Sequence, residues 1–157
     1  MNRIVAVAFA TAAQFVLLPT PAAASAPVTS QGVNITESFT ATDCRFADGN
    51  CFFSGVGRGT ATGSVSGTWN ETVNFIVFKD NSAVFSGTHV CTCTYLGRTG
   101  VITYVFEGKS PPDFSFFGRA VIVSATGGLA GLHGFELFSS DGTTPVTQVT
   151  YVLHFDP

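Results

Sequence analysis

The chain has 157 residues and a formal net charge of −3, and only 11% of its residues are charged, against about 25% in a typical domain. It has no basic cluster, which argues against nucleic acid and anionic membranes as partners. Gly, Thr, Ser and Phe take the place of charged residues, a mixture typical of an extracellular β-protein of one domain.

The first 24 residues have the three parts of an export signal. Residues 1–3 are positively charged, residues 4–18 are apolar, and Ala22, Ala23 and Ala24 fit the small-residue cleavage rule. The apolar run is shorter than the ~20 residues of a membrane span, so a cleaved signal peptide is favoured over an uncleaved anchor. We therefore expect a secreted or periplasmic protein in which residues 25–157 form one domain without a membrane span.

The remaining chain alternates apolar and polar residues with period two, interrupted by Gly, Asn and Asp, and it has no helical pattern. Residues 44–54 are expected to form a loop, and glycines would let the long segment 56–78 bend sharply. Turns are expected at residues 79–82, 97–100, 110–113 and 140–143. Strands are expected at residues 33–42, 56–78, 83–96, 101–107, 114–125, 132–139 and 146–155.

This pattern predicts an all-β fold with seven or eight antiparallel strands. Such a sheet must close or split in two to protect its edges. Long strands with interior glycines favour closure into an antiparallel barrel of about eight strands. A barrel of that size holds side chains or one small ligand.

Four glycines lie within eight residues between two apolar segments of the second half: Gly127, Gly128, Gly131 and Gly134. Glycine is needed where φ is positive or where backbones approach closely. We expect a tight corner between two strands here, at which a Cβ is poorly tolerated. Leu129 and Leu132 are expected to point inward as a plug.

Four cysteines allow three disulfide pairings in an exported protein. Cys44 and Cys51 flank a turn-like segment, so a local bridge between them is favoured. Cys91 and Cys93 alternate on one strand with Cα atoms ~6.5 Å apart, at the long end of disulfide geometry. They could be reduced or joined to each other. The spacing required for zinc is missing, and we expect no metal.

Several of these segments together resemble the allene oxide cyclase barrel superfamily, in particular its small uncharacterised bacterial members. The motifs are the turn at residues 97–100, Glu107-Gly108, the glycine run at residues 126–134 and the final strand at residues 151–155. Plant dirigent proteins have a similar glycine corner. The resemblance covers roughly residues 34–156 and implies an eight-stranded barrel with a central cavity. In the plant cyclases that cavity binds a fatty-acid-derived epoxide, but their catalytic residues cannot be matched one by one to this chain.

Two groups of residues could carry chemistry. His89, Cys91, Cys93 and Tyr95 alternate on one strand and would supply a base, two thiols and a phenol. Neighbours at i and i+2 are too far apart for a direct hydrogen bond, so a packing role is favoured. Glu71 would have a raised pKa on the inner face of the barrel, although a solvent-facing position is favoured for such an acid.

The favoured hypothesis is an exported barrel that binds a small apolar molecule or has a structural role, without catalysis or a cofactor. The abundance of Phe supports it, because apolar linings dominate ligand sites. Candidate ligand-contacting residues are Phe75, Phe85, Tyr104 and Tyr151. The alternative is an isomerase or cyclase that acts on a hydrophobic, fatty-acid-derived substrate in the same cavity.

Asn34 and Asn70 match the glycosylation sequon, which matters only in a eukaryotic secretory host.

Overall fold

The structure is a computed structural model that describes residues 25–156. The expected signal peptide lies outside these described residues. The described part contains nine strands and no helix, so it has no helical segment that could cross a membrane. The strands are β1 (Val28–Ala41), β2 (Arg45–Ala47), β3 (Asn50–Gly63), β4 (Val65–Val77), β5 (Ala83–Tyr95), β6 (Arg98–Ser110), β7 (Phe116–Gly127), β8 (Leu132–Ser140) and β9 (Val146–Phe155).

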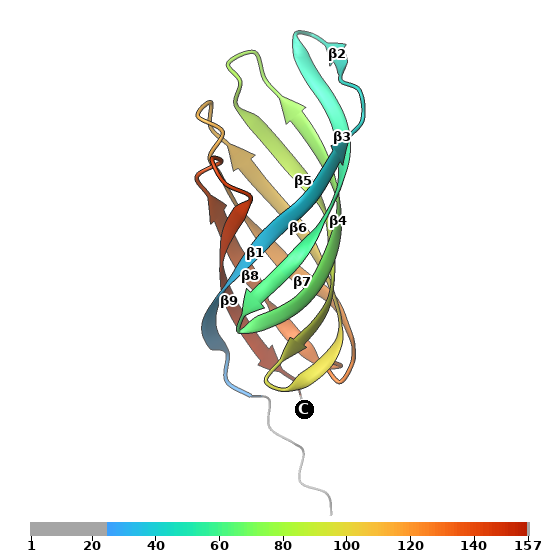
Figure 1. Ribbon diagram of the computed structural model, residues 1–157, viewed down its shortest axis with the longest axis vertical. Coiled ribbons are helices and arrows are strands. Elements are labelled where there is room, and N and C mark those ends of the chain that lie inside the picture. Colours follow the sequence, from blue (N-terminus) through green and yellow to red (C-terminus); the bar gives the residue numbers. More distant parts are fainter. Residues whose placement is uncertain (1–24, 157) are drawn as a thin grey trace, which may run out of the picture.

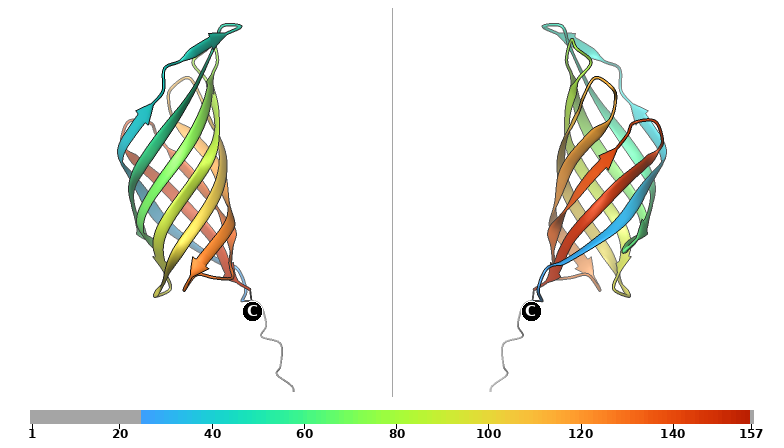
Figure 2. Two further views of the ribbon diagram at one scale, coloured as in Figure 1. Left: turned by 90° about the vertical axis from the view of Figure 1, so that its right-hand side faces the viewer. Right: turned by 90° about the vertical axis from the view of Figure 1, so that its left-hand side faces the viewer.

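Eight of the strands form a closed antiparallel barrel (Figures 1 and 2). Strands β3 to β9 pair in chain order, and β1 closes the sheet by pairing with β9 through residues 28–35 and with β3 through residues 32–41. The short β2 pairs only with β3 and extends beyond the barrel (Figure 1). The prediction of a closed all-β barrel of about eight strands is confirmed.

Strands β1 and β6 extend beyond their expected bounds, over residues 28–41 and 98–110 instead of 33–42 and 101–107, and two other segments differ in kind from the sequence-based expectation. The segment 56–78 is not one bent strand, because the chain reverses at Ser64 and residues 50–77 form the paired strands β3 and β4. Residues 44–54 are not a loop but contain the hairpin of β2 and β3. Its two turn residues, Asp48 and Gly49, have φ values of 51° and 77°, as two-residue hairpin turns require.

The glycine corner joins β7 to β8 and is as tight as expected. β7 ends at Gly127 with φ of 66°, β8 begins after Gly131 with φ of 80°, and the Leu132 amide donates to the Leu129 carbonyl at 3.0 Å. Leu129 and Leu132 are 0% and 1% exposed, so both side chains point inward. A Cβ on Gly128 would lie 2.8 Å from the Thr99 carbonyl oxygen, which belongs to the neighbouring strand.

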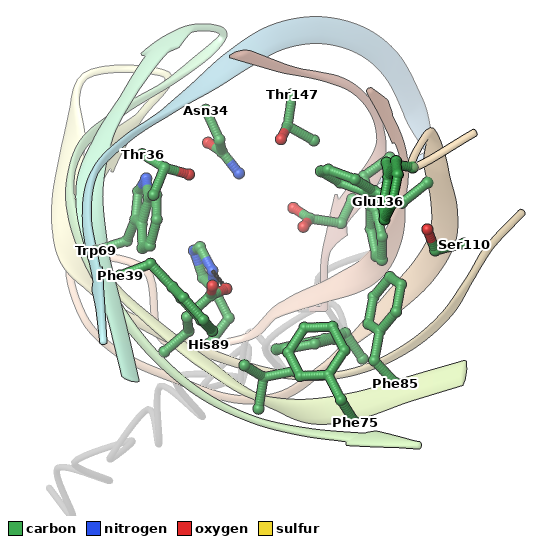
Figure 3. Close-up of a pocket in the computed structure, with 16 residues that line it drawn as sticks. Asn34, Thr36, Phe39, Trp69, Phe75, Phe85, His89, Ser110, Glu136 and Thr147 are labelled. Atoms are coloured by element: carbon green, nitrogen blue, oxygen red, sulfur yellow. Dashed lines mark ion pairs between the residues drawn. The ribbon is translucent and has the colours of Figure 1, made fainter. Parts of the chain in front are cut away.

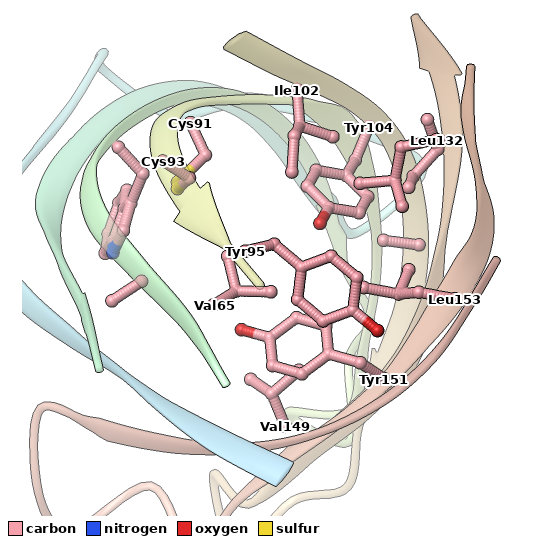
Figure 4. Packing of buried hydrophobic residues seen from close by; sticks show 14 of the residues in the cluster. Val65, Cys91, Cys93, Tyr95, Ile102, Tyr104, Leu132, Val149, Tyr151 and Leu153 are labelled. Carbon is pink, nitrogen blue, oxygen red and sulfur yellow. A yellow bond between two sulfur atoms is a disulfide. The ribbon is translucent and has the colours of Figure 1, made fainter. Parts of the chain in front are cut away.

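The barrel has two different ends. The turn end carries the short connections at residue 64, residues 96–97 and residues 128–131, and the loop end carries the connections at residues 78–82, 111–115 and 141–145. Large side chains fill the half of the barrel next to the turn end (Figure 4). The largest fully buried ones are Tyr104, Tyr151, Ile102, Leu129, Leu132, Leu153 and Val65, together with Cys91 and Cys93.

Inward-facing glycines make room for these and other large neighbours. Gly59 lies beside the Trp69 ring and Gly87 beside the Phe106 ring, at distances that leave no space for a Cβ. Small barrels commonly fit their interior in this way, with small residues opposite large ones.

The structure places both cysteine pairs within bonding distance. Cys44 and Cys51 are joined with Cα atoms 5.6 Å apart, and Cys91 and Cys93 are joined with Cα atoms 5.4 Å apart. The second pair lies inside the barrel, where both side chains belong to the packed core. Of the alternatives left open for Cys91 and Cys93, the structure has the joined form.

The glycine corner can be tested by substitution at Gly134. Its φ is +134°, and a Cβ would collide with the Val152 carbonyl oxygen on β9. We expect Gly134→Val to lower the free energy of unfolding by about 1–3 kcal/mol in urea denaturation. The control is Gly97→Asn, because Gly97 has a positive φ that Asn tolerates and nothing within 4 Å of a built Cβ. An equal loss of stability in both variants would contradict this account.

The Cys44–Cys51 bridge closes a loop between residues separated by 7 positions. The double variant Cys44→Ser, Cys51→Ser should therefore lose about 2–3 kcal/mol of unfolding free energy, the amount by which so short a loop restricts the unfolded chain. Peptide mapping without reduction should find Cys44 linked to Cys51. A link from either residue to Cys91 or Cys93 would contradict both the pairing and the strand order.

Candidate functional site

The half of the barrel next to the loop end contains a cavity of about 360 Å³ (Figure 3). The packed core closes it on the side of the turn end. Every strand of the barrel except β3 contributes to its lining. The connection at residues 111–115 also contributes. The lining residues are Asn34, Thr36, Phe39, Trp69, Glu71, Val73, Phe75, Phe85, His89, Phe106, Ser110, Phe114, Phe116, Glu136, Phe138 and Thr147.

Phenylalanines form the wall of the cavity toward the loop end. Phe85 on β5 lies at the centre, with ring centroids 5.5 Å from Phe75, 6.1 Å from Phe116 and 6.2 Å from Phe138. The closeness of these rings depends on glycines, since Gly108 lies beside Phe85 and Gly118 beside Phe138. The rings support one another, so the apolar wall is preformed.

Three ionisable side chains lie deeper in the cavity, and we call them the polar floor: Glu71 on β4, His89 on β5 and Glu136 on β8. Glu71 and His89 are register partners, and His89 Nδ1 is 3.8 Å from Glu71 Oε2. The His89 ring stacks on Trp69 with ring centroids 5.2 Å apart and forms a T-shaped pair with Tyr104 with centroids 5.7 Å apart. These contacts fix the imidazole between β4 and β6.

Glu136 is the most unusual member of the polar floor, because it is a carboxyl group that is only 4% exposed. Burial raises its pKa to about 7, the nearby Glu71 carboxylate adds to this increase, and His89 opposes it. The phenols of Tyr104 and Tyr151 also face it from β6 and β9, and burial raises the pKa of both, so they stay neutral. Within residues 25–156 no group donates a hydrogen bond to the Glu136 carboxyl.

The electrostatic balance of the lining is acidic. Glu71 and Glu136 face the cavity, and among the described residues no Lys or Arg lines it. Two polar atoms in the lining, Asn34 Oδ1 and Trp69 Nε1, are buried without a hydrogen-bond partner within residues 25–156. Buried polar groups without partners are costly, and each needs a physical explanation.

The structure separates the candidates named from the sequence into two groups. Glu71 and His89 line the cavity, as do Phe75 and Phe85. The solvent-facing position favoured for Glu71 is wrong, because Glu71 is on the same inward face as Trp69. The other candidates, Cys91, Tyr95, Tyr104 and Tyr151, belong to the packed core and do not line the cavity.

Glu136 was not among the candidates from the sequence. The available signal was the alternation along β8, in which Gly134, Glu136 and Phe138 share the face of the inward-pointing Leu132. Of the two glycosylation sequons, Asn34 lines the cavity and Asn70 is exposed on the outside.

A comparison with known proteins supports the fold. No protein-family model and no curated protein matches the chain. Among solved structures, a protein of unknown function from the DUF3224 family of Shewanella oneidensis MR-1 is similar, with a TM-score of 0.63 and 16% sequence identity. The match covers 85% of this chain and 99% of that one. The shared feature is the barrel fold. At this identity the likeness carries no function, and it does not single out the allene oxide cyclase superfamily.

The raised pKa of Glu136 predicts a dependence of stability on pH. A carboxyl with a pKa of about 7 in the fold and about 4.3 in the unfolded chain stabilises the fold when protonated, and this stabilisation is lost as pH rises through 7. Relative to Glu136→Gln, the wild-type free energy of unfolding should fall by about 3 kcal/mol between pH 4.5 and pH 8.5.

Urea denaturation of both proteins across this pH range is the measurement. The control is Glu107→Gln, which removes a carboxylate from the exposed face of β6. This control should follow the wild-type curve. A constant difference between wild type and Glu136→Gln at all pH values would show that Glu136 titrates normally.

Proposed function

We propose that this protein is an exported barrel that binds one small, largely apolar molecule in its cavity without transforming it. The single observation that carries the proposal is the unequal filling of the barrel. Core side chains close the half next to the turn end, whereas the other half keeps a cavity with phenylalanines along one side.

The dimensions and chemistry of the cavity support ligand binding. A volume of about 360 Å³ falls within the range of about 300–1,000 Å³ typical of small-molecule sites. Such sites are mostly apolar with a few polar groups that orient the ligand, and here the Phe wall and the polar floor have those two roles. An eight-stranded barrel has room for one small ligand.

Export is supported by two features from different parts of the chain. Residues 1–24 have the composition of a cleaved signal peptide. The structure pairs all four cysteines, and disulfides persist in oxidising compartments outside the cytoplasm. A secreted or periplasmic barrel of this kind would act as a carrier or scavenger.

A second candidate is an isomerase or cyclase, and Glu136 is the observation that favours it. A carboxyl group with a pKa of about 7 inside a cavity is suited to general acid–base catalysis near neutral pH. The resemblance to allene oxide cyclases would make the substrate fatty-acid-derived. However, no described Lys or Arg in the lining could pair with a fatty-acid carboxylate, so simple binding of another apolar molecule is better supported.

Ligand binding can be tested by filling the cavity from one strand. Thr147 lines the cavity, whereas its neighbour Gln148 is exposed on the outer surface of β9. The wild type should bind the apolar fluorescent probe N-phenyl-1-naphthylamine with saturable 1:1 stoichiometry. Thr147→Phe should weaken this binding by about tenfold or more, because the new ring occupies the site, and Gln148→Phe should leave it unchanged.

Fluorescence titration of the three proteins is the measurement, with thermal melts to show that each variant is folded. Equal affinity of Thr147→Phe and wild type would place the binding site outside the cavity. The absence of saturable binding by wild type would contradict the proposal.

A further inference from the structure

We propose that the cavity selects a hydrophobic ammonium compound, whose charged head binds at the polar floor and whose apolar part lies among the phenylalanines. This inference rests on the proposed function and specifies the class of ligand. It is carried by the charge of the lining, by the lack of a partner for Glu136 and by the aromatic rings around the polar floor.

The charge of the lining discriminates between possible head groups. A carboxylate ligand would meet Glu71 and Glu136, and no Lys or Arg of the described lining could neutralise it. An ammonium head would meet the same two carboxyl groups with favourable sign. In a partly water-excluded cavity such interactions are much stronger than in bulk water.

Glu136 is a buried carboxyl group that faces the cavity without a hydrogen-bond donor among the described residues. Its side chain is more than nine-tenths buried and points into the cavity from the side opposite Trp69 and Thr36 (Figure 3). Glu71 already has His89 at 3.8 Å, whereas no described residue donates a hydrogen bond to Glu136. A buried carboxylate without a partner is costly, and an N–H donor from an ammonium head would form a charge-assisted hydrogen bond with it.

Aromatic rings complete the environment that an organic cation requires. Trp69 lies next to the polar floor, and Phe85 and Phe138 begin the apolar wall above it. The faces of such rings attract ammonium groups, most strongly where water is excluded. The same rings would contact the alkyl or aryl part of the ligand. The lining therefore fits an amphipathic cation better than a neutral lipid or a fatty acid.

The test compares three ligands that share one alkyl chain and differ only in the head group: octylammonium, 1-octanol and octanoate. Isothermal titration calorimetry with the wild type at pH 8 should give the highest affinity for octylammonium, by about tenfold over 1-octanol. Octanoate should bind most weakly.

Two variants locate the source of the preference. Glu136→Gln should weaken octylammonium binding by about tenfold and change 1-octanol binding less than about twofold. Glu107→Gln, which removes an outward-facing carboxylate, should bind all three ligands like the wild type.

A pH series with octyltrimethylammonium adds a readout on the wild type itself. This ligand keeps its charge at every pH, so any change in affinity comes from the protein. Wild-type affinity should rise from pH 5.5 to pH 8.5 as Glu136 loses its proton. His89 faces the same space and is present in both the wild type and Glu136→Gln. Glu71, the other carboxylate facing the cavity, is present in the wild type and in Glu136→Gln. The part of the pH-dependent rise in affinity that is lost in Glu136→Gln is therefore due to Glu136.

The outcomes separate this inference from the proposed function. If 1-octanol binds as tightly as octylammonium, or octanoate binds best, the ammonium preference is wrong while the apolar binding site remains. An octyltrimethylammonium affinity that is flat with pH would also overturn it. If none of the three ligands binds, the proposed function fails and this inference fails with it.

Discussion

The pairing of β1 with β3 is the contact on which the rest of the structure depends. It closes the sheet, because residues 32–41 of β1 occupy the edge of β3 while residues 28–35 remain paired with β9. Closure removes both edges of an otherwise open sheet and separates an inner face from an outer face. Once the sheet is closed, the alternating direction of successive side chains along each strand decides which of them fill the barrel and which meet solvent.

The interior created by this closure is filled unequally, and that inequality produces the candidate site. Toward the turn end, Tyr95, Tyr151 and Leu153 pack with the two leucines of the glycine corner. Toward the loop end, phenylalanine rings gather on one side of the barrel, and the cavity remains between them and the polar side chains of β1 and β9. Glu136 lies at the boundary between the two halves, so its carboxyl is buried by the core and still faces the cavity.

The sequence was sufficient where large and polar residues alternate strictly. Along β5 the alternation correctly placed His89, Cys91, Cys93 and Tyr95 on one face, and the glycine run correctly placed the corner before β8. It failed at the β3–β4 reversal, because residues 55–64 are mostly small and carry no apolar period. The polar floor could not be predicted either. It joins residues of β4, β5 and β8, and their proximity depends on the register of seven successive strand pairs and on closure, none of which a local pattern contains.

Xenon binding in crystals tests most directly the claim that one half of the barrel is packed and the other is available to a ligand. Xenon enters apolar cavities and is excluded from well-packed cores. The structure predicts a xenon atom among Phe75, Phe85 and Phe138, and none among Tyr95, Tyr151 and Leu153. Xenon in the half next to the turn end, or no xenon anywhere inside the barrel, would contradict the account.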